Sequence, residues 1–191
     1  KKSKGLMYVG TDDGAIWVSR NTGKTWKNIS SSLQSISGRY ISSLQASQHT
    51  TNTVYMAIDG HRSDDMRVHT MVSRNNGRSW SRIGKGITQG PVRVLREDPV
   101  NPDLLYAVTV FGIFVSLDKG RSWLRLQGNL PSVPVHDMAI QERENELVIA
   151  THGRGIWTLD ISGLQGCPQK VQKKAVDLIQ PKPISVYRKL P

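Results

Sequence analysis

Aspartates fall in two adjacent pairs, and paired carboxylates are the residue type that glycoside hydrolysis requires. Enzymes of that class hold two carboxyl groups about 5–9.5 Å apart. The candidates here are Asp12, Asp13, Asp64 and Asp65. Their spacing does not determine the distance between the pairs, and a general acid would also need a raised pKa. The sequence therefore assigns no catalytic residue.

Metal and cofactor chemistry lacks the residues that it would need. No metal-ligand spacing occurs among the five histidines, which are His49, His61, His69, His136 and His152. Cys167 is the single cysteine, which excludes an internal disulfide and a cysteine-based metal cluster. We therefore expect neither a metal site nor a cofactor.

The net charge of +11 suggests a polyanion-binding protein until the charges are located along the chain. Residues 1–4 and 164–191 together hold nine basic residues and one acidic residue, whereas residues 5–163 hold 17 basic and 14 acidic residues. A solvated tail is the expected role of the basic ends, with contact to an anionic partner as the alternative. No aromatic ladder separates the basic residues, as it does in single-strand binders, so nucleic acid is not favoured as a partner.

An eight-residue motif occurs three times, at 19–26, 73–80 and 116–123, with the pattern Ser-x-(Asn/Asp)-x-Gly-(Lys/Arg)-(Thr/Ser)-Trp. An Asn or Asp side chain bonds to the backbone two residues on, and glycine supplies the positive φ of a tight turn. Each copy therefore predicts a β-hairpin turn followed by a large apolar anchor. The residues with these structural roles are Ser19, Asn21, Gly23, Trp26, Ser73, Asn75, Gly77, Trp80, Ser116, Asp118, Gly120 and Trp123.

Strand patterns flank every copy of the motif. Alternating polarity with β-branched and aromatic residues predicts strands at 6–9, 16–18, 40–47, 53–57, 70–72, 92–96, 104–108, 113–115, 135–140, 146–150 and 155–159. Four short antiparallel strands per repeat are typical of a β-propeller blade, whereas a β-sandwich does not repeat with this period. The fold class is therefore all-β, without a helix before residue 163; a short helix is predicted over Val171 to Ile179.

The repeated motif resembles the Asp-box, or BNR repeat, of sialidases, xyloglucan-cleaving glycoside hydrolases and sortilin-type receptors. The segments at 129–137, 150–161 and 178–183 sharpen the resemblance. They are similar to the C-terminal part of large bacterial secreted, sortilin-like "BNR-repeat glycosyl hydrolase" proteins. The resemblance implies a propeller and says little about function. The catalytic constellation of sialidases is not assignable here, and the cysteine-rich module of sortilin-type receptors is absent.

The phase of the strands predicts an incomplete propeller of about three to four blades. The chain opens in the second strand of a blade and closes in the third strand of another, which leaves two complete and two incomplete blades. Closed propellers typically have four to eight blades. We therefore expect a partial propeller at 1–163, a basic tail or linker at 164–191, and the remainder of the same propeller as a partner.

The resemblance also implies which loops face a ligand. Propeller ligands favour the face that carries the loops between second and third strands, and long loops on a rigid scaffold often carry function. The candidates for this face are His61, Arg62, Arg67, His152 and Arg154, with Asp12, Asp13, Asp64 and Asp65 beside them. The alternatives are a solvated loop that touches a neighbouring blade at 61–67, and a glycine turn at 152–155.

The function that we predict is a non-catalytic binding or scaffold module that engages a glycan or a protein. Its parent would be secreted, periplasmic or on the cell surface, although no signal peptide follows the basic opening residues. No apolar run is long enough for a transmembrane segment. The alternative is part of a glycoside hydrolase whose active site the rest of the propeller completes.

Overall fold

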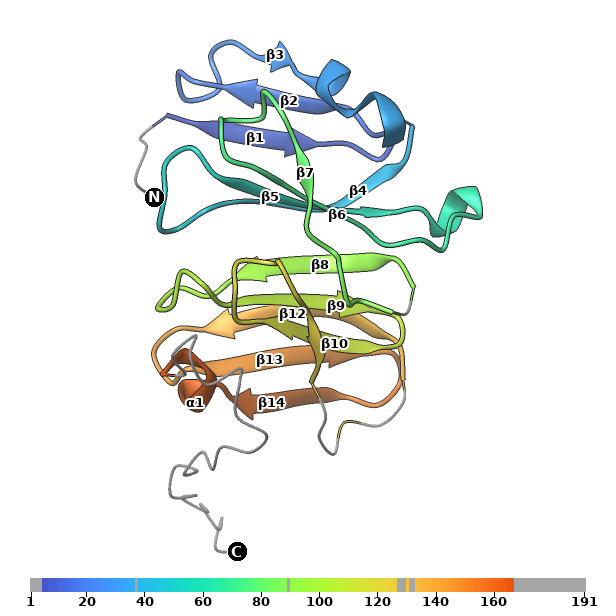
Figure 1. The fold of residues 1–191 in the computed structure, drawn as a ribbon, viewed down its shortest axis with the longest axis vertical. Coiled ribbons are helices and arrows are strands. Elements are labelled where there is room, and N and C mark those ends of the chain that lie inside the picture. The colour runs from blue at the N-terminus through green and yellow to red at the C-terminus, as the bar shows by residue number, and fades with distance from the viewer. Residues whose placement is uncertain (1–4, 37, 89, 127–129, 131–132, 167–191) are drawn as a thin grey trace, which may run out of the picture.

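The computed structural model describes residues 5–36, 38–88, 90–126, 130 and 133–166 of the 191-residue chain, and these residues are nearly all β. Four antiparallel sheets lie one beside the next in the order of the sequence (Figure 1). Within the described residues, the first and fourth sheets have three strands and the second and third have four. The all-β fold and the phase of the predicted blades are therefore confirmed.

Strands that are consecutive in the chain pair with one another in every sheet. The first sheet comprises β1 (Met7–Gly10), β2 (Ile16–Ser19) and β3 (Lys27–Asn28). The second comprises β4 (Tyr40–Ala46), β5 (Val54–Asp59), β6 (His69–Ser73) and β7 (Ser81–Arg82). The third comprises β8 (Val92–Glu97), β9 (Leu105–Thr109), β10 (Gly112–Ser116) and β11 (Leu124–Arg125). The fourth comprises β12 (Val135–Gln141), β13 (Glu146–Thr151) and β14 (Ile156–Asp160).

Apolar side chains pack between neighbouring sheets, so that each interface has its own core. The middle strands of the third sheet, β9 and β10, are buried along their whole length because a sheet covers each face. Such strands lose the alternation of buried and exposed residues and become continuously apolar. Representative core residues are Met56 and Met71 in the first interface, Phe114 and Trp123 in the second, and Tyr106 and Met138 in the third.

The three copies of the repeated motif form turns with the same hydrogen bonds. In each copy the first serine accepts the N–H of the glycine at 2.8 Å. The Asn or Asp oxygen accepts the N–H of the following Thr or Ser at 2.9 Å. The serines are buried beneath the turns, so the geometry gives these polar side chains a structural role.

The residue before the glycine adds a long-range bond to each turn. Its backbone has a positive φ between 58 and 61°, and its N–H donates at 2.9 Å to the carbonyl oxygen two residues before the neighbouring strand begins. The donor and acceptor pairs are Thr22 with Gly5, Asn76 with Asn52, and Lys119 with Asp103. The turn between the third and fourth strands is thereby tied to the start of the second strand.

Two 3-10 helices contradict the prediction that no helix occurs before residue 163, and a short α-helix spans that position. The 3-10 helices are η1 (Ser30–Ile36) and η2 (His61–Ser63), and the α-helix is α1 (Ser162–Gln165). These turns are too short for the 3.6-residue periodicity that reveals helices in a sequence. The bonds that close η2 are local, from Ser63 N–H to Gly60 and from Asp64 N–H to His61.

Helix α1 returns the chain to the third sheet. The side-chain amide of Gln165 donates to Asp98 Oδ2 at 3.0 Å, and the side-chain amide of Asn101 donates to the Gln165 carbonyl at 3.1 Å. The predicted boundary between residues 163 and 164 remains a prediction. Residues 167–191 of the predicted basic tail, which include Cys167 and the predicted helix at 171–179, lie outside the described residues.

None of the helices in the described residues has both the length and the apolar character needed to cross a membrane.

Candidate functional site

A β-bulge interrupts the first strand of the second, third and fourth sheets at the same place. The pairing skips one residue in β4, β8 and β12, and the extra residues are Ser42, Arg93 and His136. A bulge leaves the extra residue outside the ladder and turns its side chain away from the regular alternation. All three extra residues line one cavity.

The cavity has a volume of about 610 Å³, within the usual range for ligand sites. The first strands of the second, third and fourth sheets, β4, β8 and β12, are called the inner strands here, and they supply most of the cavity wall. The end of β5 and the loop between β5 and β6 supply the rest. That loop projects from the end of the sheets opposite to α1 (Figure 1). The lining residues are Tyr40, Ser42, Asp59, His61, Arg62, Arg93, Val94, Arg96, His136 and Asp137.

Aspartate 59 joins the loop to the inner strands. Its Oδ1 accepts the backbone N–H of His61 at 2.8 Å, and its Oδ2 lies 3.8 Å from Nε of Arg93. The first contact holds the loop where its side chains enter the cavity. The second is longer than a hydrogen bond, so Arg93 keeps its donors available to a ligand.

Two further arginines of the cavity are held by neutral groups. The guanidinium of Arg62 lies 5.2 Å from the ring centroid of Tyr40, which is a cation–π contact. Arg96 donates through Nη1 to the Ser43 hydroxyl at 3.0 Å and to the Leu95 carbonyl at 3.1 Å. Among the described residues, neither arginine forms an ion pair with a carboxylate.

His152, a ligand-face residue predicted from sequence, does not line the cavity itself but lies against His136, which does. Their ring centroids are 5.1 Å apart, and the His152 N–H donates to Pro134 at 2.9 Å. Arg154 is exposed and does not line this cavity. The loop that carries both residues needs its two glycines for positive φ values of 74 and 76°, and the need is conformational, since no atom would obstruct an added Cβ.

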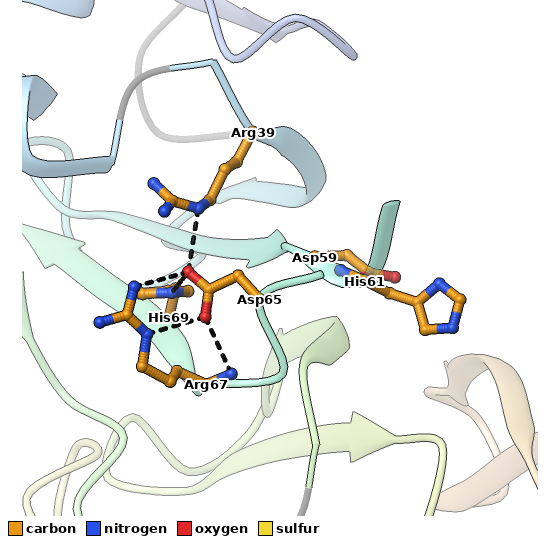
Figure 2. A network of polar contacts seen from close by, with 6 residues as sticks. All are labelled: Arg39, Asp59, His61, Asp65, Arg67 and His69. Carbon is orange, nitrogen blue, oxygen red and sulfur yellow. Dashed lines mark hydrogen bonds and ion pairs between the residues drawn. The ribbon is translucent and has the colours of Figure 1, made fainter. Parts of the chain in front are cut away.

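The other loop carboxylate, Asp65, is buried in a cationic network (Figure 2). Arg67 donates to both of its oxygens at 2.8 and 2.9 Å, and His69 Nε2 lies 2.9 Å from Oδ2. Arg39 Nε is 3.0 Å from Oδ2, an ion pair without the geometry of a hydrogen bond. The ring of His61 points away from this network.

This network makes Asp65 unsuitable as a general acid. The hydrogen bonds from Arg67 lower the pKa of Asp65 far below the ordinary aspartate range, against the raising effect of burial and with further help from His69. A general acid needs a pKa shifted in the opposite direction. Asp64 and Arg67 line a neighbouring hollow of about 580 Å³ with Asp65, and neither reaches the cavity of Arg93.

Asp12 and Asp13 lie in the exposed turn between β1 and β2. Asp13 accepts hydrogen bonds from the Thr11 hydroxyl and the Ala15 N–H, and the bond from Thr11 lowers its pKa. The turn packs through Gly14 against the backbone of Arg39. Neither aspartate lines the hollow that contains Asp64 and Asp65.

Of the residues predicted from sequence, His61 and Arg62 line the cavity, and the inner-strand residues were not predicted. A signal for the latter exists, since Ser42, Arg93 and His136 each directly follow an Ile or Val that is the first or second residue of its strand. Aligning the repeats at these positions would have placed them together. Within the described part of the chain, no group of three or more His, Cys, Asp or Glu side chains could hold a metal ion.

No family model matches the chain. A curated relative, the xyloglucanase of Hypocrea jecorina (strain QM6a), is 28% identical over 118 residues, which are 62% of this chain and 13% of that protein. The chain therefore spans a small part of the relative that it matches.

Solved structures resemble the fold at low sequence identity. An ancestral GH74 enzyme superposes with a TM-score of 0.62 and 18% identity, covering 79% of this chain and 21% of its own. YCF48 bound to D1 peptide has a TM-score of 0.61 and 16% sequence identity, and the match covers 83% of this chain and 49% of YCF48. The GH74 xyloglucanase of Xanthomonas campestris has a TM-score of 0.59 and 12% sequence identity, and the match covers 81% of this chain and 27% of that enzyme. These neighbours support a β-propeller fold.

Proposed function

We propose that the chain is a non-catalytic binding part of a β-propeller, and that the cavity lined by Arg93 is where it holds a glycan or a protein segment. One observation carries this proposal. Three sheets place a bulged polar residue in one cavity, Ser42, Arg93 and His136, which is the arrangement expected of a site built for recognition.

The carboxylates support binding over catalysis. Asp13 and Asp65 have lowered pKa values, because hydrogen bonds stabilise their ionised forms. In the cavity itself, Asp59 is engaged by the His61 N–H and Asp137 by the Met138 N–H. Each of these oxygens accepts a backbone donor, which suits a fixed anion that orients a ligand.

The test is a binding panel on the intact protein, using immobilised glycans and peptides, with an Arg93→Gln variant. We expect binding to at least one class of ligand and its loss in the variant. Binding that persists unchanged in Arg93→Gln would contradict this location. Arg78→Gln is the matched control, since Arg78 is exposed in the second repeated turn, away from the cavity.

A glycoside hydrolase is the second candidate, because Asp59 and Asp137 share the cavity and a xyloglucanase is among the relatives. Xyloglucan hydrolysis by the intact protein, lost in Asp59→Asn or Asp137→Asn, would establish this candidate. The same assay with Asp64→Asn tests the loop aspartate named from sequence. The binding proposal predicts no hydrolysis in any of these samples.

We further propose that the repeated turns are Asp-boxes, that the parent protein is secreted, periplasmic or at the cell surface, and that another part of the propeller covers the first sheet. The last proposal is supported by the exposed apolar side chains Met7, Val9, Trp17 and Trp26. Limited proteolysis and size-exclusion chromatography of the intact protein would test it. A monomeric intact protein in which proteases readily cut the first sheet would contradict it.

A further inference from the structure

The charges of the Arg93 cavity differ from those of the neighbouring hollow. Around Asp65, one buried carboxylate forms ion pairs with both Arg39 and Arg67. In the cavity, Arg62 and Arg96 have no carboxylate partner among the described residues, and Arg93 has only the 3.8 Å contact with Asp59. Three guanidinium groups therefore share the cavity with the carboxylates of Asp59 and Asp137, and among the described residues none of the three has a carboxylate within hydrogen-bonding distance.

We propose that the ligand of this cavity is an acidic sugar, whose ring carboxylate is held by Arg62 and Arg93. This inference rests on the proposed binding function and names its ligand class. Guanidinium groups match carboxylates through paired, charge-assisted hydrogen bonds. A ligand carboxylate would give Arg62 and Arg93 the anionic partner that Asp65 gives to Arg39 and Arg67.

The remaining groups of the cavity select for hydroxyls beside that carboxylate. Asp59 and Asp137 are acceptors, and they would repel a compact anion such as sulfate that has no donors to offer them. Sugar hydroxyls donate to carboxylates and also accept from imidazole and hydroxyl donors. The imidazole groups of His61 and His136 and the hydroxyl group of Tyr40 line the same space.

Arg96 has a positioning role in this arrangement. Its contacts with Ser43 and Leu95 fix the guanidinium against the inner strands. The Ser42 hydroxyl donates at 2.9 Å to the Val92 carbonyl, beside Arg93. The second and third sheets are thereby held together where the cationic groups meet, which reduces the ordering that a ligand must impose.

The experiment is calorimetric titration of the intact protein with trigalacturonate and with its methyl ester, which keeps the rings and hydroxyls but removes the charge. We expect the acid to bind at least about tenfold more tightly than the ester, as for a charge-assisted contact. Arg62→Gln and Arg93→Gln should each weaken binding of the acid about tenfold or more and leave binding of the ester unchanged. Arg78→Gln changes neither.

Other outcomes separate this inference from the function on which it rests. Equal binding of acid and ester, or binding of neither, would overturn the acidic-sugar inference. Binding of octaglutamate in place of both sugars would overturn it too, while leaving a protein-binding module. Hydrolysis of either sugar would overturn the non-catalytic function itself. Because Arg62 lies on an exposed loop, its variant tests the charge without disturbing the core.

Discussion

Trp26 and Trp123 occupy the same place in two repeats and have different surroundings. Each follows the repeated turn by the same spacing, yet Trp26 is 38% exposed and Trp123 only 4%. The indole N–H of Trp123 donates to the Ile83 carbonyl of the preceding sheet. In the described residues no sheet precedes the first one, so Trp26 has no such partner.

The strands beside these tryptophans show the same difference. The motif serine pairs with Met7 in the first sheet and with Leu105 in the third, so these two residues occupy equivalent positions. In the same way, the cross-strand pair Val9 and Trp17 of the first sheet corresponds to the pair Ala107 and Phe114 of the third. The side chains of the third sheet are buried, and those of the first are exposed. Identical turns therefore coexist with different packing, because the turn is a local structure and the burial depends on the next sheet.

The largest expected effect is at the buried member of the pair. Trp123→Ala removes a buried indole and its hydrogen bond to Ile83, so the free energy of unfolding should fall by about 3–5 kcal/mol. Urea denaturation followed by circular dichroism measures the change. A loss below about 1 kcal/mol would mean that this anchor does not hold the second and third sheets together.

The motif serines should behave alike in both regions. Ser116→Ala and Ser19→Ala each leave a glycine N–H without its acceptor, which costs about 1–3 kcal/mol for a buried donor. The same denaturation experiment should give similar losses for the two variants. If Ser19→Ala left the free energy of unfolding unchanged while Ser116→Ala lowered it, turn stability would depend on the neighbouring sheet. That outcome would contradict the view that the turn is a local structure.

Trp26→Ala should cost less than either serine variant. Its side chain lacks a covering sheet among the described residues, and substitutions of such surface positions usually change stability by about 0.5 kcal/mol or less. The measurement is the same urea titration, on the 191-residue chain. In an intact protein that covers this face, the cost should rise, which is the direct test of the proposed neighbouring part.

The smallest expected effect is a pH dependence confined to the third turn. Burial alone would raise the pKa of Asp118, but hydrogen bonds from Ser122, Ser116 and the Arg121 backbone outweigh it, so the pKa is lowered. A lowered folded-state pKa gives stability that is present above the unfolded value of 3.8 and is lost as the pH falls through the folded value.

Asp118→Asn tests this, since the first two turns already carry Asn21 and Asn75 at the same position. The variant should lose less stability than the wild type between pH 7 and about pH 3. Asn75→Asp is the reciprocal change and should add a pH dependence of the same sign. Parallel pH profiles for the wild type and Asp118→Asn would contradict the assignment.

Strands and turns could be predicted from the sequence because their causes are local. β-Branched and aromatic residues such as those at 113–115 favour extended chain, and Ser116, Asp118 and Gly120 close a turn through bonds that span four residues or fewer. Pairing of consecutive strands follows from the short connections. The three short helices escaped prediction because one or two turns produce no periodic signal.

The tertiary structure alone decided the site and the role of each charged residue. Asp65 appears in the sequence as a loop carboxylate, and the fold surrounds it with Arg67 and His69 of its own segment and with Arg39 of another. Arg93 and His136 come together because bulges in separate strands turn them into one cavity. Local patterns specify strands and turns, whereas burial, charge pairing and convergence depend on which sheets lie next to one another.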